Sequence, residues 1–219
     1  MHSLEVGPAS LAWAATSPGP VRTRPRLNDL TPRDQARAAG FGVDRRREFV
    51  VGRSLVSSLI GRLFPDASGW SIGTRACARC GKRHGAVEVV GVPAVAGVSY
   101  ARGIVVAAVA LSPPTGSVGV DVELDAADTT RTRDLERLLG RSRQPVLLRW
   151  TRIEAVLKAD GRGLLVEPRD VRVRGTHASI AGDTTRYELA EVAGPPGYVI
   201  SLAWSGAESS AASVGPATG

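Results

Sequence analysis

The sequence predicts an α+β fold made of two similar halves, and three observations lead to this class. Segments typical of helices and strands follow one another in the order helix then strands, and this order occurs twice along the chain. Apolar residues form 43% of the 219 residues, which is enough for a substantial core. The longest apolar run, at about 103–112, is too short to cross a bilayer.

The first half is expected to open with two helices. In "LTPRDQARA", Thr31 is a suitable N-cap and Pro32 occupies the first helical position. The following segment, "DRRREFVVGRSLVSSLIGRLF", repeats Phe49, Leu55 and Leu59 at helical spacing, which predicts a longer amphipathic helix. Three candidate strands come next, with the sequences "AVEVVGV", "VAGVSY" and "GIVVAAVAL".

The second half is expected to begin after the turn "SPPTGS" with the strand "VGVDVEL". An arginine-rich connection leads to a helix from about Pro145 to Asp160, and the glycines of "GRG" are expected to end it. Four strand candidates complete this half: "DVRVRG", "HASIAG", "RYELAEV" and "YVISLAW".

These signals divide the chain into an N-terminal half at 28–113 and a C-terminal half at 114–205. Residues 1–27 contain four prolines and little periodicity, so we expect them to form a loose leader. Residues 206–219 are small and polar, and we expect a flexible tail there.

The charge of the chain is basic, with a formal net charge of +7. A basic surface favours an anionic partner, which can be a phosphate-bearing ligand, a nucleic acid or an acidic protein. Only Lys82 and Lys158 are lysines among 28 basic residues, so each of them stands out in a chain that prefers arginine. The first 30 residues lack the charged-then-apolar order of a secretory signal, and we expect a soluble cytoplasmic protein.

Two cysteines, Cys77 and Cys80, occur together in "CARCGKRHG". With His84 they offer three possible zinc ligands, whereas a structural zinc site usually needs four. The alternative interpretation is a tight turn that carries two reduced thiols.

Two carboxylates interrupt the apolar strand "VGVDVEL". Because side chains alternate across a strand, Asp121 and Glu123 share one face, and Val120, Val122 and Leu124 share the other. Two carboxylates on one face repel each other unless a cation lies between them, and oxygen ligands favour a hard cation such as Mg²⁺. The alternative is an edge strand whose charges face water.

The helix "LLRWTRIEAVLKAD" carries a second pair of charged residues. Glu154 and Lys158 are four residues apart and share one helix face, which is also common in simple surface ion pairs. A lysine differs from an arginine because its ammonium group gives up a proton more readily. The rarity of lysine in this chain therefore favours a chemical role for Lys158.

Together, "GVDVE" and the downstream "WTRIEAVLKADGRGL" resemble the two signature motifs of the 4′-phosphopantetheinyl transferases of the broad-specificity, surfactin-synthetase-activating type. Those motifs read (G/I)(V/I)D(V/I)E and W(T/S)xKE(A/S)xxKxxGxG. The segments "LTPRDQARA", "DRRREFVVGRSLV" and "CARCGKRHG" are similar to the N-terminal half of the family, in the same order. The resemblance covers residues 28–204.

The resemblance implies a pseudo-symmetric fold with coenzyme A (CoA) and Mg²⁺ in the cleft between the halves. It implies transfer of the phosphopantetheine arm of CoA to a serine of an acyl or peptidyl carrier protein. By residue, it implies that Asp121, Glu123 and Glu154 hold Mg²⁺ against the CoA pyrophosphate. Glu154 would also help to deprotonate the carrier serine, and Lys158 would neutralise charge on the departing 3′,5′-ADP.

The resemblance also implies a set of CoA-binding residues: Arg37, Arg46, Arg47, Ser99 and Tyr100. Carrier proteins are acidic, which suits a chain of charge +7. On this interpretation the partners are CoA and the carrier protein, with no nucleic acid and no membrane, and the protein is a monomer.

Several residues depart from the family pattern, mostly where the nucleotide is anchored. Ile153 stands where the family has lysine, Tyr100 replaces a histidine that meets the 3′-phosphate, and Ala86 replaces a phosphate-binding lysine. Glu48 stands in place of an arginine, although arginines 45 to 47 are adjacent to it. Each lost charged hydrogen bond to phosphate would cost roughly 1.5–3 kcal/mol of binding energy.

Three interpretations therefore stay open at the level of the sequence. The first is a divergent, active transferase. The second is a protein of transferase fold whose pocket has lost its CoA anchors and serves another ligand or reaction, or none. The third is a basic module that binds nucleic acid or an acidic partner, which rests on net charge alone.

Overall fold

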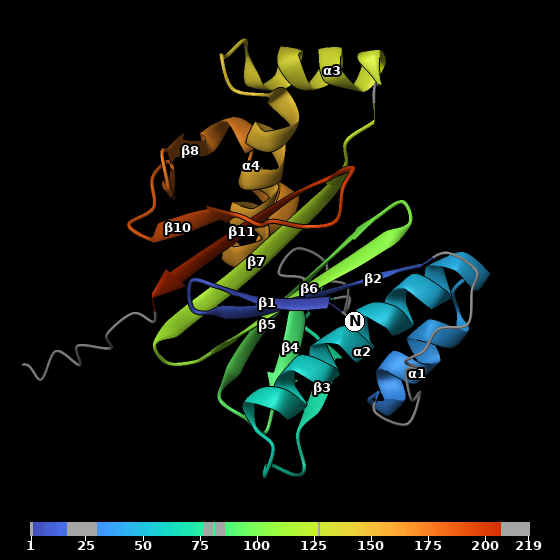
Figure 1. The fold of residues 1–219 in the computed structure, drawn as a ribbon. Coiled ribbons are helices and arrows are strands. Elements are labelled where there is room, and N and C mark those ends of the chain that lie inside the picture. The colour runs from blue at the N-terminus through green and yellow to red at the C-terminus, as the bar shows by residue number, and fades with distance from the viewer. Residues whose placement is uncertain (1, 17–29, 77–80, 82–85, 127, 207–219) are drawn as a thin grey trace, which may run out of the picture.

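The computed structural model describes residues 2–16, 30–76, 81, 86–126 and 128–206, and it shows a mixed α and β fold with antiparallel sheets (Figure 1). The predicted α+β class is confirmed. The first sheet has the strand order β1-β2-β6-β5 and consists of β1 (His2–Val6), β2 (Ala9–Ala15), β5 (Ala94–Ala101) and β6 (Ile104–Leu111).

The second sheet has five strands in the order β7-β11-β10-β9-β8. Its strands are β7 (Thr115–Leu124), β8 (Val171–Arg174), β9 (His177–Ile180), β10 (Arg186–Glu191) and β11 (Tyr198–Gly206). A separate two-stranded sheet pairs β3 (Ser71–Thr74) with β4 (Val87–Val90).

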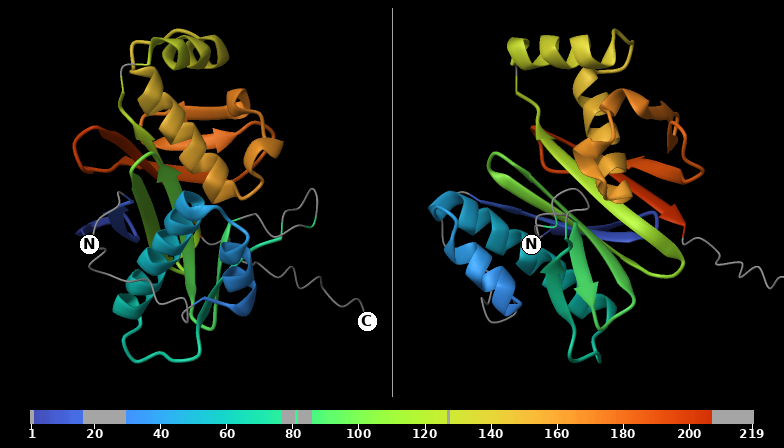
Figure 2. Two further views of the ribbon diagram at one scale, coloured as in Figure 1. Left: turned by 90° about the vertical axis from the view of Figure 1, so that its right-hand side faces the viewer. Right: turned by 180° about the vertical axis from the view of Figure 1, so that it is seen from behind.

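The described helices lie at two ends of the molecule (Figures 1 and 2). They are α1 (Pro32–Ala39), α2 (Val43–Leu63), α3 (Thr129–Leu139) and α4 (Val146–Asp160), with short 3₁₀ turns at η2 (Gly163–Leu165) and η3 (Pro168–Asp170). The Thr31 hydroxyl accepts a hydrogen bond from the backbone N–H of Asp34 at 3.2 Å, so the predicted N-cap of α1 is confirmed. Gly161 ends α4 in the left-handed conformation, as predicted.

Three apolar clusters hold together four layers, which are α2, the four-stranded sheet, the five-stranded sheet and α4. Residues of β2 and β6 pack against residues of β7 and β11, so the two large sheets stack face to face. The outer face of the four-stranded sheet is covered by α2, and the five-stranded sheet is covered by α4. The face-to-face contact places β5 beside β7, which matters for the site described below.

The predicted loose leader at 1–27 is wrong for residues 2–15, which form the hairpin β1–β2. The register pairs Leu11 of β2 with Ala108 of β6. Leu11 is buried between the sheets and Ala12 is buried toward α2, so β2 is covered on both faces. A strand buried on both faces lacks the alternation that identifies a strand in sequence, which explains the error. Residues 17–27 lie outside the described part of the chain.

The arginine-rich connection after β7 contains α3, which sequence periodicity does not predict. Of the residues in α3, Leu135 is buried and most others are exposed, so an apolar stripe is nearly absent. The carboxylate of Asp128 caps the helix by accepting hydrogen bonds from the backbone N–H groups of Thr130 and Arg131. At the C-terminus, Gly206 of the expected tail belongs to β11, and the remainder lies outside the described residues. None of the helices in the described part of the chain combines the length and hydropathy that a membrane span needs.

Candidate active site

The candidate site lies where α4 packs against β7. Gly119 of β7 faces Ala155 and Ala159 of α4, and these small residues allow close contact between strand and helix. Within this contact the residues of both signature motifs come together, because Asp121 follows Gly119 on β7 and Lys158 precedes Ala159 on α4.

Asp121 is the buried centre of the site, with 4% of its surface exposed. Its Oδ1 accepts a hydrogen bond from Nζ of Lys158 at 2.6 Å and another from the hydroxyl of Ser99 at 2.9 Å. Its Oδ2 is buried and has no hydrogen-bond partner among the described residues. Burial raises the pKa of Asp121, against the opposing effect of the Lys158 charge. The interpretation of β7 as a strand with water-facing charges is therefore wrong for Asp121.

Glu123 lies on the same face of β7 as Asp121, as the alternation of the strand predicts. Its Oε1 accepts a hydrogen bond from the indole N–H of Trp150 on α4 at 3.2 Å. It also forms a hydrogen-bonded ion pair with Arg131 of α3. This contact raises the pKa of Arg131. Glu123 therefore joins the strand to both neighbouring helices.

Glu154 and Lys158 face the two β7 carboxylates from α4. Burial raises the pKa of Glu154; the charge of Lys158 lowers it, and the charges of Asp121 and Glu123 raise it. The three carboxylates thus lie close enough to repel one another. Lys158 is one-third exposed and donates to Asp121 and Ser99, which leaves one of its three N–H donors for another group.

The arrangement fits Mg²⁺ in some respects but not in all. Three carboxylates are the right donor type, and the partnerless Oδ2 of Asp121 leaves one coordinating atom available. However, no three His, Cys, Asp or Glu side chains in the described part of the chain form a ready metal-binding group. Lys158 and Arg131 already supply positive charge to Asp121 and Glu123. A metal ion would therefore have to compete with these two internal cations.

A second charged feature, here called the arginine–aromatic cluster, consists of Arg37, Arg45, Arg53, Phe41, Phe49 and Tyr100. The Arg45 guanidinium lies over the ring of Tyr100 at 5.4 Å, and the Arg37 guanidinium lies over the ring of Phe49 at 5.3 Å. The buried Arg53 pairs with Asp34 at 2.7 Å. Burial and the charge of Arg53 lower the pKa of Arg37, so positive charge is concentrated here.

The predicted CoA-binding residues do not form one group. Ser99 and Tyr100 are neighbours on β5 and project to opposite faces: Ser99 contacts Asp121, whereas Tyr100 packs toward Gly52 of α2. Arg37 belongs to the arginine–aromatic cluster, Arg46 is exposed and Arg47 pairs with Asp44.

The arginine of α2 that contacts the Tyr100 ring is Arg45, which the sequence analysis named only beside Arg46 and Arg47 as a substitute for the missing arginine. Arg45, Phe49 and Arg53 recur every four residues and share one helix face, and this spacing was the available signal. Arg45 contacts the Tyr100 ring, and burial raises the pKa of Tyr100 while Arg53 and Arg45 oppose that rise.

Two further predictions from the sequence concern Ile153 and a possible zinc site. Ile153, which stands where the family that the sequence resembles has lysine, is 6% exposed and packs in the core beneath α4. Its side chain therefore points away from the carboxylates. Cys77, Cys80 and His84 lie outside the described residues, and the question of a zinc site stays open.

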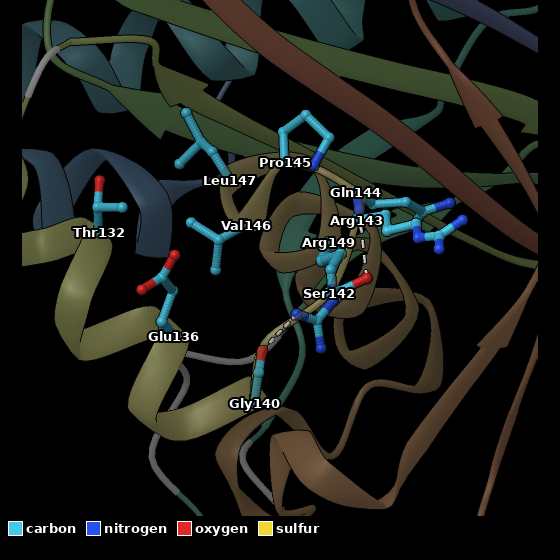
Figure 3. Close-up of a pocket in the computed structure, with 10 residues that line it drawn as sticks. All are labelled: Thr132, Glu136, Gly140, Ser142, Arg143, Gln144, Pro145, Val146, Leu147 and Arg149. Carbon is cyan, nitrogen blue, oxygen red and sulfur yellow. Dashed lines mark hydrogen bonds between the residues drawn. The ribbon is translucent and has the colours of Figure 1, made fainter.

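Two cavities in the described part of the chain are lined by residues other than the three carboxylates. One, of about 440 Å³, lies between α3 and the start of α4, where Thr132 and Glu136 face Val146 and Leu147 (Figure 3). The other, of about 420 Å³, lies between α1 and the β3–β4 sheet and includes Arg37 in its lining. The carboxylates thus lie outside both hollows.

Comparison of the chain with protein-family models and with curated proteins finds no match.

Proposed function

We propose that this chain is a divergent 4′-phosphopantetheinyl transferase that moves the phosphopantetheine arm of CoA to a serine of an acidic carrier protein, with Mg²⁺ as cofactor. The observation that carries the proposal is the meeting of Asp121, Glu123, Glu154 and Lys158 at one contact between β7 and α4. These residues come from the two motifs that resemble the family. The geometry thus supports a shared chemical task for them.

The proposed reaction requires the carrier serine oxygen to form a bond to the β-phosphorus of CoA as the bond from that phosphorus to 3′,5′-ADP breaks. Mg²⁺ would be held by Asp121, Glu123 and Glu154 and would neutralise pyrophosphate charge. Burial raises the pKa of Glu154 in the absence of a metal ion, and Glu154 is the carboxylate that we assign as proton acceptor from the serine. The remaining N–H of Lys158 suits a hydrogen bond to the departing phosphate.

The charge distribution supports an acidic protein substrate. Most of the arginines between 131 and 152 are exposed on or next to α3 and the start of α4, close to Glu123. Positive charge at this place would attract an acidic carrier protein and orient it toward the carboxylates.

The test is to incubate the purified protein with Mg²⁺, CoA and a panel of apo carrier proteins, and to measure the mass of each carrier. The expected result is a gain of one phosphopantetheine arm on at least one carrier. Glu154→Gln is expected to slow transfer at least about 100-fold, because it removes both the proposed general base and one proposed ligand of Mg²⁺. Glu188→Gln is the matched control, since Glu188 is an exposed partner of His177. A panel in which no carrier gains mass would refute the proposal.

A second candidate is a transferase-like protein whose pocket no longer takes CoA. The observation that favours it is the internal neutralisation of Asp121 and Glu123 by Lys158 and Arg131, together with the altered anchor positions. This candidate predicts Mg²⁺ binding that Asp121→Ala abolishes, without transfer to any carrier. The same mass measurement, combined with calorimetric titration of Mg²⁺, separates the two candidates.

A further inference from the structure

Ser99 joins three elements at the centre of the candidate site. It lies on β5, and 2% of its surface is exposed. Its hydroxyl donates to Oδ1 of Asp121 on β7 at 2.9 Å and accepts from Nζ of Lys158 on α4 at 2.7 Å. It also accepts from the backbone N–H of Val122 at 3.3 Å. One small side chain therefore links the first sheet to the strand and the helix that carry the charged groups.

The hydrogen-bonding capacity of Ser99 is fully used by these contacts. A serine hydroxyl has one donor and two acceptor positions, and Ser99 gives one bond and receives two. A phosphate group could contact this hydroxyl only if one of the three bonds were broken. The geometry therefore argues against the direct contact with CoA that the sequence resemblance implies for Ser99.

We propose that Ser99 is a positioning residue that holds Asp121 and Lys158 in fixed orientations. This inference deepens the proposed function and rests on it for the catalytic consequence. By holding Oδ1 of Asp121, Ser99 leaves the buried Oδ2 available for a cation. By accepting one N–H of Lys158, it fixes the direction in which the remaining N–H of the ammonium group can point.

Lysine-selective ¹⁵N labelling tests this role directly, because Lys82 and Lys158 are the lysines of the whole chain. An ammonium group held by fixed hydrogen bonds exchanges its protons with water slowly and gives an observable signal. Lys82→Arg assigns the Lys158 signal. Ser99→Ala is expected to speed proton exchange at Lys158 about tenfold, the factor expected for the loss of a charge-assisted hydrogen bond. An unchanged exchange rate would overturn the inference.

Two further variants separate positioning from packing. Ser99→Cys refills the space but forms weak hydrogen bonds, so it is expected to behave like Ser99→Ala. Recovery of slow exchange in Ser99→Cys would assign the effect to packing and overturn the proposal. Ser201→Ala is the control, because Ser201 is also a buried strand serine, and its hydroxyl lies 2.8 Å from that of Thr151 on α4. It is expected to leave the Lys158 signal unchanged.

Transfer kinetics provide the second readout. Ser99→Ala is expected to lower kcat about tenfold with little change in KM for CoA, whereas loss of a direct CoA contact would mainly raise KM. A change confined to KM would overturn the inference. If the wild-type protein transfers nothing while Ser99→Ala still speeds exchange at Lys158, the proposed function fails and the positioning role of Ser99 stands. If the wild type transfers and exchange is unaffected by Ser99→Ala, only the positioning role fails.

Discussion

A β-carbon added to Gly119 of β7 would lie 2.1 Å from the carbonyl oxygen of Ala155 on α4, so the strand and the helix touch through their backbones. It would also lie 2.3 Å from the backbone nitrogen of Ala159. This close approach is what brings Lys158 within hydrogen-bond distance of Asp121. The geometry of the site therefore requires a glycine at position 119, although this residue has no side chain that could take part in the chemistry.

We predict that Gly119→Ala lowers the free energy of unfolding by about 3 kcal/mol or more, because the new methyl group would overlap backbone atoms that cannot rotate away. Urea unfolding monitored by circular dichroism measures this change. The matched control is Gly61→Ala in α2, where, apart from adjacent residues and the helix's own backbone, no atom of the described residues lies within 4 Å of the added carbon. This control is expected to stabilise the protein by about 0.5–1 kcal/mol through helix propensity. An unchanged unfolding midpoint for Gly119→Ala would contradict the close approach.

The ion pair between Arg131 and Glu123 predicts that Arg131→Gln strengthens Mg²⁺ binding. Arg131 competes with any metal ion for the Glu123 carboxylate, and the pair is partly exposed. Its removal is expected to increase affinity about two- to fivefold, which corresponds to about 0.5–1 kcal/mol. Calorimetric titration of Mg²⁺ checks the prediction. Arg137→Gln, on the same helix but paired with Asp134, should leave affinity unchanged. Weaker binding in Arg131→Gln would mean that Glu123 is not a ligand.

The different positions of adjacent arginines on α2 predict different effects on CoA binding. Both arginines are exposed, but the Arg45 guanidinium lies over the Tyr100 ring and pairs with Glu48, which makes it part of the arginine–aromatic cluster. We expect Arg45→Gln to weaken CoA binding tenfold or more, since a charged hydrogen bond to phosphate contributes about 1.5–3 kcal/mol. Arg46→Gln should have almost no effect. Equal effects of the two substitutions, measured by equilibrium dialysis, would argue against a role for the arginine–aromatic cluster.

The burial of Ile153 predicts that a lysine is not tolerated at this position. Ile153→Lys would place a charge in the core under α4, and we expect a loss of at least about 3 kcal/mol in the free energy of unfolding. Ile153→Leu keeps the apolar volume and should cost less than about 1.5 kcal/mol. Thermal unfolding of both variants tests this pair. A stable Ile153→Lys protein would show that this face of α4 can reach solvent.

The hydrogen bonds of Asp160 predict a pH dependence of stability. Burial alone would raise the pKa of Asp160, but hydrogen bonds from Arg162, including one from Nε at 2.8 Å, outweigh it and hold that pKa below its usual value. A lowered pKa stabilises the folded state above the unfolded-state pKa of about 3.9, and this stabilisation is lost as the pH falls through the folded-state value.

Asp160→Asn is therefore expected to be less stable than the wild type by about 1 kcal/mol at pH 7, after allowance for the exposure of Arg162. The difference should shrink as the pH falls below the unfolded-state pKa of about 3.9. Urea unfolding at several pH values measures it. Asp134→Asn, which alters an exposed pair, serves as the control. A difference that stays constant down to pH 3 would show that the carboxylate charge has no part in the effect.

The elements that the sequence predicts well are those with one apolar face and recognisable ends. Helices α1 and α4 have a cap or a stop that can be read from Thr31, Pro32 and Gly161, whereas α2 is recognised by apolar residues at helical spacing. The shared face of Asp121 and Glu123 also follows from the period of a strand. These local rules place each charged residue on one face of its own element, whereas the expectation that the carboxylates and Lys158 lie together came from the family resemblance.

The features that the sequence does not predict depend on packing between distant segments. Strand β2 is covered on both faces by segments far away in the chain, so its own pattern gives no sign of a strand. Helix α3 is mostly exposed, and its short apolar stripe consists of three leucines near its end: Leu135, Leu138 and Leu139. The opposite orientations of Ser99 and Tyr100 could be foreseen from strand alternation, but a resemblance to a family assigned both residues to one ligand.

The N-terminal hairpin has a consequence for the order in which the chain folds. Strand β2 pairs with β6, and the turn at Gly7 is covered by the ring of Trp204 near the end of β11. Contacts between residues so far apart form slowly, because a long loop must close before any energy is gained. During synthesis, β2 must therefore wait for β6 before the two strands can pair, and Trp204 covers the turn at Gly7 only after β11 has been made. Until then the apolar residues of the hairpin stay exposed, and exposed apolar residues can associate with those of other chains.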